Sequence, residues 1–313
     1  MKKIIKWIAV AIGVGVVLSL VGGYVYFDRK FTPEENRLTV LGEARDIPVK
    51  WVESDGNPHA ALLLPVKIRG IDRTFFMQLD SGAPSTVFYR NALQSLRAAF
   101  PGATAPAGES GRIAMDFGIG DLRVSSAGSQ QLNYGSGVDV ASPDAVNIIG
   151  TVGTDLLEKR VAVLDFKSNV VSFVEKTAES GFSDLEFRKR KILIPATLGN
   201  ESLKLLYDSG TSGYQLLVNH EKWQELRIAN APARIEKGNS WGRALKVVSA
   251  PADRKLQVSG TPLQLSEVTY VEGTSRMQQL LMKRSGMQGM VGNRIFLNHV
   301  LVLDAANRKF KVE

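Results

Sequence analysis

Phe75–Gly82 reads FFMQLDSG, and Leu203–Gly210 reads LKLLYDSG. Each stretch is a mostly apolar run of strand length that ends in Asp-Ser-Gly. Another apolar run precedes each one, at Leu62–Ile68 and Ile192–Leu198, and turn-forming residues lie between the paired runs. Both regions therefore predict a β-hairpin whose second strand ends in an acid.

The likeness between the two halves continues downstream. Gly153 precedes Asp165 by twelve residues, and Gly292 precedes Asp304 by the same interval. Each of these aspartates ends a Val-Leu-Asp run, and a basic turn and a last short strand follow it. A single Asp-Ser-Gly is an ordinary turn sequence in which the aspartate caps backbone amides. Two of them in matching surroundings indicate an internal duplication.

The spacing of strands and turns predicts an all-β body of two lobes, residues 46–178 and 187–313, joined by a polar linker at 179–186. Helices are expected to be few, and Arg90–Phe100 and Gly273–Arg284 are the segments with the best helical pattern.

Composition excludes several classes of function. The chain has 313 residues and no cysteine, so disulfides, Cys-based zinc sites and a thiol nucleophile are excluded. Its histidines (His59, His220 and His299) are far apart and lack zinc-ligand spacing, so we expect no metal and no cofactor. The net charge is +8, and the basic residues are scattered along the chain apart from a short run at Arg188–Lys191. We interpret it as a basic surface and expect no nucleic-acid partner.

The amino terminus has the pattern of a membrane anchor. Residues 1–6 carry three lysines, and residues 7–27 are uncharged with aromatic side chains at both ends. As a helix this stretch would span roughly 30 Å, the thickness of the hydrocarbon core. A cleaved signal peptide is the alternative, but the stretch ends in Tyr-Val-Tyr-Phe rather than at a small-x-small site. We therefore predict a single-pass protein with a cytoplasmic tail at 1–6, a transmembrane helix at 7–27 and a tether at 28–45.

With a cytoplasmic amino terminus, the body would lie outside the cytoplasm. An exported body without disulfides suits the periplasmic side of a bacterial envelope.

The two acidic loops resemble those of the aspartic peptidases. Asp80–Phe88 (DSGAPSTVF) is similar to the retropepsin signature Asp-Thr/Ser-Gly-Ala, and Asp208–Ser212 (DSGTS) is similar to the second active-site loop of pepsin-like enzymes. The resemblance covers residues 46–313. It implies a pepsin/retropepsin-like double β-barrel with pseudo-twofold symmetry, in which Asp80 and Asp208 lie side by side in a cleft.

Two further segments resemble the family's apolar-apolar-Gly element, which packs behind each active-site loop. They are Thr151–Gly153 and Met290–Gly292. Ile148–Gly150 is a competing register in the first half. We favour Gly153, because the interval to the following Val-Leu-Asp run then matches that after Gly292.

The resemblance implies peptide hydrolysis by an aspartic endopeptidase, with Asp80 and Asp208 as the catalytic residues. Two carboxyls held a few ångström apart resist ionising together, so they share one proton. One then takes a proton from water while the other donates to the substrate carbonyl oxygen. The expected partner is an extended polypeptide substrate. Both acids come from one chain, so no obligatory dimer is expected.

The loop residues next to the acids have implied supporting roles. They are Ser81, Gly82, Ala83, Ser209, Gly210 and Thr211. The glycines let the backbone turn tightly against the acids, and the resemblance implies that each serine hydroxyl bridges to the opposite loop. A bond from the Thr211 hydroxyl to the Asp208 carboxylate would make Asp208 the charged partner and Asp80 the proton holder, because Ala83 has no hydroxyl.

Three segments remain candidates for the cover over the cleft. Tyr134 begins a Tyr-Gly-Ser-Gly similar to a pepsin-type flap tip, Trp241 lies in the turn-like 238–242, and 107–112 occupies a retropepsin-like flap position. Two rival functions also stay open: a non-catalytic peptide-binding or sensing module on the same scaffold, and an envelope assembly protein that uses the body as a docking surface. Retention of both acids and both loop glycines argues against binding alone.

Overall fold

The computed structural model describes residues 29, 32–102, 111–177, 180–240, 242–273 and 286–313. The chain divides into two units, Met1–Glu35 and a compact body at Asn36–Glu313. The tail predicted at 1–6 and the transmembrane helix predicted at 7–27 lie outside the described residues. Among those that are described, no helix combines the length and apolar character needed to span a bilayer.

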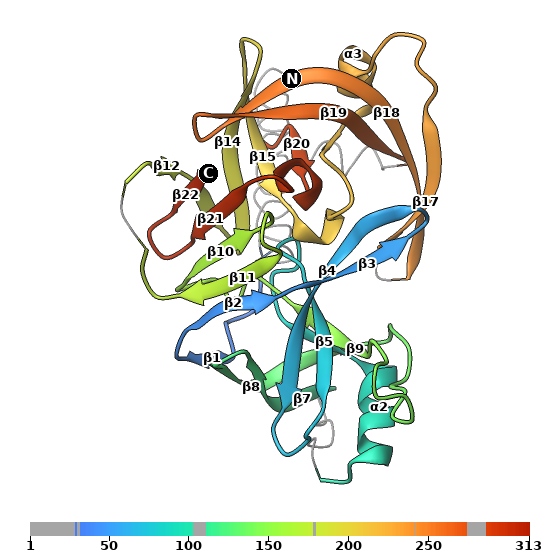
Figure 1. Ribbon diagram of the computed structural model, residues 1–313, viewed down its shortest axis with the longest axis vertical. Coiled ribbons are helices and arrows are strands. Elements are labelled where there is room, and N and C mark those ends of the chain that lie inside the picture. Colours follow the sequence, from blue (N-terminus) through green and yellow to red (C-terminus); the bar gives the residue numbers. More distant parts are fainter. Residues whose placement is uncertain (1–28, 30–31, 103–110, 178–179, 241, 274–285) are drawn as a thin grey trace, which may run out of the picture. The chain divides into compact units, whose positions relative to one another are not determined.

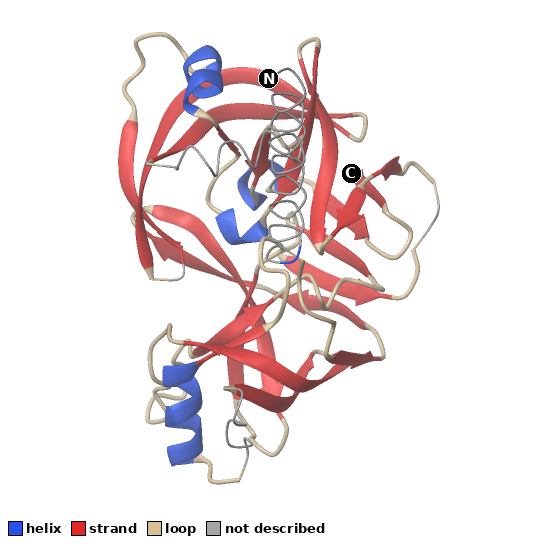
Figure 2. Cartoon of the chain, turned by 180° about the vertical axis from the view of Figure 1, so that it is seen from behind, coloured by secondary structure: helices blue, strands red, loops and turns tan. Residues whose placement is uncertain are grey.

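Strands dominate the described body and assemble into separate sheets (Figures 1 and 2). The first sheet forms the amino-terminal lobe, and its strands are β1 (Leu38–Leu41), β3 (Lys50–Ser54), β4 (Asn57–Ile68), β5 (Thr74–Leu79), β6 (Val87–Tyr89), β7 (Arg112–Ile119), β8 (Leu122–Leu132) and β9 (Ile148–Val152). Their order is β1-β8-β6-β9-β5-β4-β3, and β7 pairs with β4 and β8. Helix α2 (Arg90–Ala99) packs beside β6 and β9.

A second sheet forms the carboxyl-terminal lobe. Its strands are β13 (Glu186–Arg188), β14 (Lys191–Leu198), β15 (Glu201–Tyr207), β16 (Leu216–Val218), β17 (Arg234–Ser240), β18 (Arg243–Val258), β19 (Thr261–Glu272) and β20 (Gly289–Val291). Their order is β13-β14-β15-β20-β16-β19-β18-β17. The short helices are the 3₁₀ turns η1 (Ser209–Thr211) and η2 (Asn293–Phe296) and helix α3 (His220–Leu226).

A third sheet takes strands from both halves and joins the lobes. It is built from β2 (Ala44–Pro48), β10 (Val161–Asp165), β11 (Val170–Val174), β12 (Ser183–Asp184), β21 (Val300–Asp304) and β22 (Lys309–Val312). Their order is β12-β22-β21-β10-β11-β2, so the halves meet where β10 pairs with β21. Figure 1 shows this sheet between the β4–β5 hairpin of one lobe and the β18–β19 hairpin of the other.

Alternating apolar residues explain why the acid-bearing strands form where they do. In β5, Phe75, Met77 and Leu79 are buried, while the residues between them are partly exposed. This period of two is that of a strand with one face on a core. One continuous apolar core extends through both lobes and includes fully buried Phe75 and Phe296.

The hairpins predicted from the sequence are present as β4–β5 and β14–β15. The predicted helix at 90–100 is α2, whereas 273–284 lies outside the described residues apart from Gly273. Two boundaries differ from the predicted ones. Residues 28–45 were expected to form a tether, but β1 and the start of β2 lie there, because Leu38 and Val40 pack against the core. Part of the expected linker 179–186 is strand β12, which pairs with β22.

Candidate active site

Each of the two predicted acids follows directly on the end of a strand. Asp80 comes after β5 and Asp208 after β15. The Asp80 amide donates to the Val152 carbonyl oxygen at 3.0 Å, and the Asp208 amide donates to that of Val291 at 2.9 Å. These bonds continue the parallel pairings β5–β9 and β15–β20. The two loops therefore leave their lobes in equivalent ways.

The structure brings the two acids together. The Asp80 and Asp208 carboxyls lie within hydrogen-bonding reach of each other. Each carboxyl also lies against the glycine of the opposite loop, so that a Cβ added to Gly82 would lie 2.6 Å from Asp208 Oδ1 and one added to Gly210 would lie 2.5 Å from Asp80 Oδ1. Only glycine fits at these two positions, because a side chain there would displace a carboxyl.

The loop serines form a reciprocal set of hydrogen bonds. Ser81 N donates to Ser209 Oγ at 2.8 Å, and Ser209 N donates to Ser81 Oγ at 2.8 Å. The Ser81 hydroxyl donates in turn to the Tyr207 carbonyl oxygen, and the Ser209 hydroxyl donates to that of Leu79. Both serines are buried. The bridging expected of them is therefore present, and it locks the loops together.

Burial governs the protonation of the pair. Asp80 Oδ1 accepts from the Gly82 and Ala83 amides, and Asp208 Oδ1 accepts from the Gly210 amide. Burial raises the pKa of both carboxyls, and burial together with the charge of Asp80 raises the pKa of Asp208 to about 7. The pair therefore retains a proton well above the pH at which an exposed carboxyl loses it.

The role expected of the Thr211 hydroxyl is wrong. It donates to the Asp208 main-chain carbonyl oxygen at 2.9 Å rather than to the carboxylate, because the 3₁₀ turn η1 directs it back along the chain. The reason for making Asp208 the charged partner is thereby lost. Because burial raises the pKa of both carboxyls, the shared proton belongs to the pair rather than to one member of it.

Gly153 and Gly292 lie behind the two active-site loops. A Cβ on Gly153 would meet the Ser85 carbonyl carbon at 2.5 Å, and one on Gly292 would meet the Thr211 carbonyl oxygen at 2.2 Å. These close approaches place the two glycines in equivalent positions, as the favoured register requires. Gly150 instead lies within β9, opposite Met77 of β5.

The acids lie in a cleft of about 530 Å³ between the lobes. Its walls combine apolar and polar side chains with backbone from both halves. They include Val52, Asn57, Ala60, Ala61, Gln78, Tyr89 and Tyr134 from the amino-terminal lobe, and Tyr214, Leu217, Glu236, Leu245, Val247, Val271 and Met290 from the carboxyl-terminal lobe. A cleft with partly apolar walls and two convergent acids is a candidate catalytic site.

Tyr134 forms part of the amino-terminal wall. It packs edge-to-face on Tyr89 with ring centroids 5.0 Å apart, and the Tyr89 hydroxyl lies 2.7 Å from Thr151 Oγ1. Burial raises the pKa of Tyr89 to about 12, so it stays neutral.

The β17–β18 hairpin reaches across the cleft from the carboxyl-terminal lobe. Glu236, Lys237 and Gly238 of β17 line the cleft. At the tip, a Cβ added to Gly242 would lie 3.8 Å from Tyr134 Cδ2, so the hairpin ends beside the opposite lobe. Trp241 and most of the alternative cover at 107–112 lie outside the described residues.

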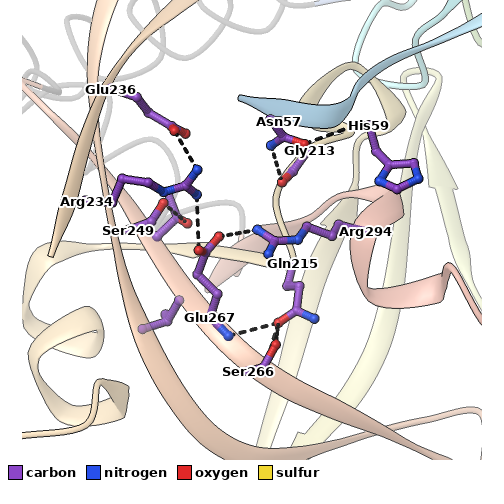
Figure 3. Close-up of polar contacts among 12 residues, drawn as sticks. Asn57, His59, Gly213, Gln215, Arg234, Glu236, Ser249, Ser266, Glu267 and Arg294 are labelled. Carbon is purple, nitrogen blue, oxygen red and sulfur yellow. Dashed lines mark hydrogen bonds and ion pairs between the residues drawn. The ribbon is translucent and has the colours of Figure 1, made fainter. Parts of the chain in front are cut away.

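Sequence reasoning missed several residues that hold the site. Asn57 Nδ2 donates to the Gly213 carbonyl oxygen at 2.8 Å and so joins the β3–β4 hairpin to the loop of the other lobe (Figure 3). Tyr214 and Glu236 both line the cleft. A usable signal was the interval from Asp208 to Gly292, which is longer than that from Asp80 to Gly153. The longer interval contains the β17–β18 hairpin.

Arg190 was also missed, because the basic run at Arg188–Lys191 was interpreted as surface. Its side chain is buried and pairs with Glu158 at 3.3 Å. It also donates to the Pro84 carbonyl oxygen and to Ser85 Oγ, while the Arg190 carbonyl oxygen accepts from the Thr154 hydroxyl. Arg190 therefore joins the β13–β14 turn to the back of the Asp80 loop.

The described residues hold no cluster of three or more His, Asp or Glu side chains arranged to bind a metal ion. No protein-family model matches the chain, and a search of curated proteins gives no match. Among solved structures, the crystal structure of an aspartic proteinase from Irpex lacteus matches 88% of this chain and 97% of its own, at 11% identity and a TM-score of 0.49.

Proposed function

We propose that this chain is an aspartic endopeptidase that hydrolyses extended polypeptides with Asp80 and Asp208. The observation that carries the proposal is the close pair of carboxyls in the cleft between the lobes, each packed against the glycine of the opposite loop, with the pKa of both raised by burial. An exposed turn aspartate has neither a carboxyl partner nor a reason to retain a proton. A module that only binds peptides has no use for two acids held this close.

The reaction follows from the charge state of the pair. The ionised member of the pair takes a proton from a water molecule, whose oxygen forms a bond to the substrate carbonyl carbon. The protonated member gives its proton to the carbonyl oxygen, so that a neutral gem-diol forms. Breaking of the C–N bond then accompanies proton transfer from one aspartic acid to the leaving nitrogen, while a gem-diol hydroxyl gives its proton to the other carboxylate. The products are a carboxyl and an amine, and the pair again holds one proton.

The loop contacts fix the distance on which this proton sharing depends. The reciprocal serine bonds set the spacing of the loops, and Gly82 and Gly210 let each carboxyl approach the opposite backbone. A pair already in place before substrate binds needs little rearrangement in the reaction. We propose the β17–β18 hairpin as the cover under which the substrate strand lies.

Cleavage of a denatured protein substrate by the purified full chain tests the proposal, with and without pepstatin. We expect the unmodified chain to cleave the substrate and pepstatin to block the cleavage. Asp80→Asn and Asp208→Asn should each abolish it. Asp165→Asn is the matched control, because Asp165 ends a repeated strand and caps the turn amide of Ser168. Peptide binding without cleavage by the unmodified chain would support the sensing module instead.

We further propose that residues 7–27 anchor the enzyme and that its body acts outside the cytoplasm. The uncharged stretch after a lysine-rich tail supports this. Carbonate-resistant membrane association of the full chain, lost on deletion of residues 2–27, is the expected result. Release of the full chain by carbonate would contradict the anchor. The accessibility of the body to added protease, compared between intact and opened cells, would show on which side of the membrane the body lies.

A further inference from the structure

Strands β3 and β4 continue beyond the amino-terminal sheet as a two-stranded arm. Strand β4 pairs with β5 from Leu63 onward, whereas the ladder of residues 57–62 is with β3. We call residues 50–62 the arm, and in Figure 1 it extends from its own lobe towards the carboxyl-terminal lobe. An isolated two-stranded hairpin is marginally stable at best, so the contacts of the arm decide how firmly it is held.

The tip of the arm is a tight turn. Ser54 and Asn57 face each other, and Asp55 and Gly56 form the two-residue loop between them. Both loop residues have positive φ, +50° and +74°. This is the sign pattern of a type I′ turn, for which Asp-Gly is a preferred sequence. Asn57, the first residue after the turn, therefore has a defined position at the end of the arm.

Hydrogen bonds hold the Asn57 side chain at both ends. Its Oδ1 accepts from the His59 amide at 3.1 Å, and its Nδ2 donates to the Gly213 carbonyl oxygen at 2.8 Å (Figure 3). The first bond lies within the arm, and the second crosses to the other lobe, where Gly213 follows Asp208 by five positions. Asn57 is only 8% exposed. We call the bond between Asn57 and Gly213 the latch.

Gly213 leaves the space that the latch occupies. A Cβ added to Gly213 would lie 2.2 Å from Asn57 Nδ2, and the three nearest atoms all belong to the Asn57 side chain. Gly213 does not have a positive φ, the conformation that by itself favours glycine. Its lack of a side chain therefore serves the contact with Asn57 rather than its own backbone.

The latch completes a clamp on the loop that follows Asp208. From behind, the carboxyl-terminal lobe holds Ser212, whose hydroxyl accepts from Asn293 Nδ2 at 2.8 Å and whose carbonyl oxygen accepts from the Arg294 amide at 3.0 Å. From the other lobe, Asn57 meets the next residue, and both Asn57 and Gly213 line the cleft. The arm and the loop therefore form a continuous part of the cleft wall.

We infer that Asn57 is a positioning residue that fixes the arm to the Asp208 loop and so sets the width of the cleft for the substrate strand. The inference rests on the proposed function and adds the contact that preforms this part of the wall. The serine bonds hold the carboxyl pair without the arm, so loss of the latch leaves the chemical step intact. Substrate then has to order the tip as it binds, and the latch acts on KM rather than on kcat.

Hydrogen exchange of the full chain tests the latch without requiring activity. In Asn57→Ala we expect the amides of 52–54 and 60–62 to exchange about tenfold faster, because a buried hydrogen bond that holds the tip is lost. The His59 amide is set aside, since it loses its own acceptor. Amides of β5 and β15 should be unchanged.

Asn307→Ala is the matched control for the exchange experiment. Asn307 Nδ2 also makes a bond of 2.8 Å, to Asp304 Oδ2 in the turn after β21. It should leave the exchange of the arm unchanged. Unchanged exchange of the arm in Asn57→Ala, or an equal change in Asn307→Ala, would overturn the inference.

Gly213→Ala breaks the same contact from the other side. Its methyl has to displace the Asn57 side chain, so the arm should again exchange about tenfold faster. In the double variant of Asn57→Ala and Gly213→Ala, the methyl takes the space of the lost amide. The double variant should therefore be no worse than Asn57→Ala alone. Additive effects of the two changes would contradict the latch.

Kinetics supply the second readout. Asn57→Ala and Gly213→Ala should each raise KM about tenfold with kcat within about twofold. A loss confined to kcat would overturn the inference. If the unmodified chain cleaves nothing, the proposed function fails, and the exchange of the single and double variants still decides whether the latch holds the arm.

Discussion

Val163 and Val302 face each other in the antiparallel ladder between β10 and β21. They occupy equivalent positions in the two repeats, each two residues before the aspartate that ends its Val-Leu-Asp run. Since equivalent residues can face each other only on a twofold axis, the pseudo-twofold axis passes through this pair. The same axis relates the reciprocal contacts of Ser81 with Ser209 and of Gly82 and Gly210 with the opposite acids.

The raised pKa of Asp208 predicts a pH dependence of stability. Its pKa rises from 3.8 to about 7 on folding, so the folded state retains a proton that the unfolded chain loses. The associated stability is complete below pH 3.8 and is lost as the pH rises through about 7. It amounts to a few kcal/mol, on the order expected for such a shift. Urea unfolding of Asp208→Asn between pH 4 and 8 should show a flatter dependence than the unmodified chain. An equally steep dependence would contradict the shift.

Substitution of either loop glycine should separate the acids. The Cβ of Gly82→Ala would lie 2.6 Å from Asp208 Oδ1, so the carboxyl must move. A displacement of about 1 Å can lower kcat roughly 100-fold. Gly128→Ala is the control, because its Cβ would meet neighbours at ordinary distances from 3.6 Å. Steady-state kinetics on folded protein measure the effect, and equal kcat values for the two variants would refute the close packing.

The serine contacts should contribute to stability as one unit. Ser81→Ala leaves the buried Ser209 amide without its acceptor, which costs about 1–3 kcal/mol in the free energy of unfolding. Ser209→Ala does the same to the Ser81 amide. Because both belong to one network, the double variant should lose less than the sum of the two. Ser125→Ala, which removes an exposed bond to Asp116, should change stability little. Additive losses on denaturant unfolding would mean that the two contacts are independent.

Arg190 should support the Asp80 loop from behind. Arg190→Ala removes a buried cation from Glu158 and from the Pro84 carbonyl oxygen, at a cost of about 3 kcal/mol. Lys189→Ala is the matched control, because both residues have positive φ in the same turn and Lys189 is not buried. The free energy of unfolding, measured with denaturant, and kcat should both fall more for Arg190→Ala than for Lys189→Ala. Equal effects of the two variants would assign the loss to the turn alone.

The repeated pattern predicts the fold because it is local. Apolar alternation before Asp80 and Asp208 is enough to predict both hairpins, and the Gly153 register places the segment behind the first loop. Helix α3 escaped prediction, since it is short and only Trp223 and Leu226 of it are buried.

Contacts between distant segments could not be predicted from the sequence in the same way. The Arg190 side chain lies in a run with the composition of a solvated turn, and only the packing of the lobes makes it buried. The Thr211 hydroxyl was expected to reach the Asp208 carboxylate, but it bonds to the Asp208 main-chain carbonyl oxygen instead. Glu236 shows no distinguishing pattern in the sequence, because its place in the cleft wall depends on the folded lobe.

The position of β21 along the chain affects how the protein is made. Strands β21 and β22 follow every other strand, yet β21 supplies the partner of β10 at the centre of the molecule. The whole first lobe is therefore synthesised before β10 can pair with β21, and until the second lobe follows, the Ser81 amide lacks its acceptor on Ser209. A chain made only as far as the first lobe carries Asp80 without Asp208, so the carboxyl pair forms only after the second lobe has been made.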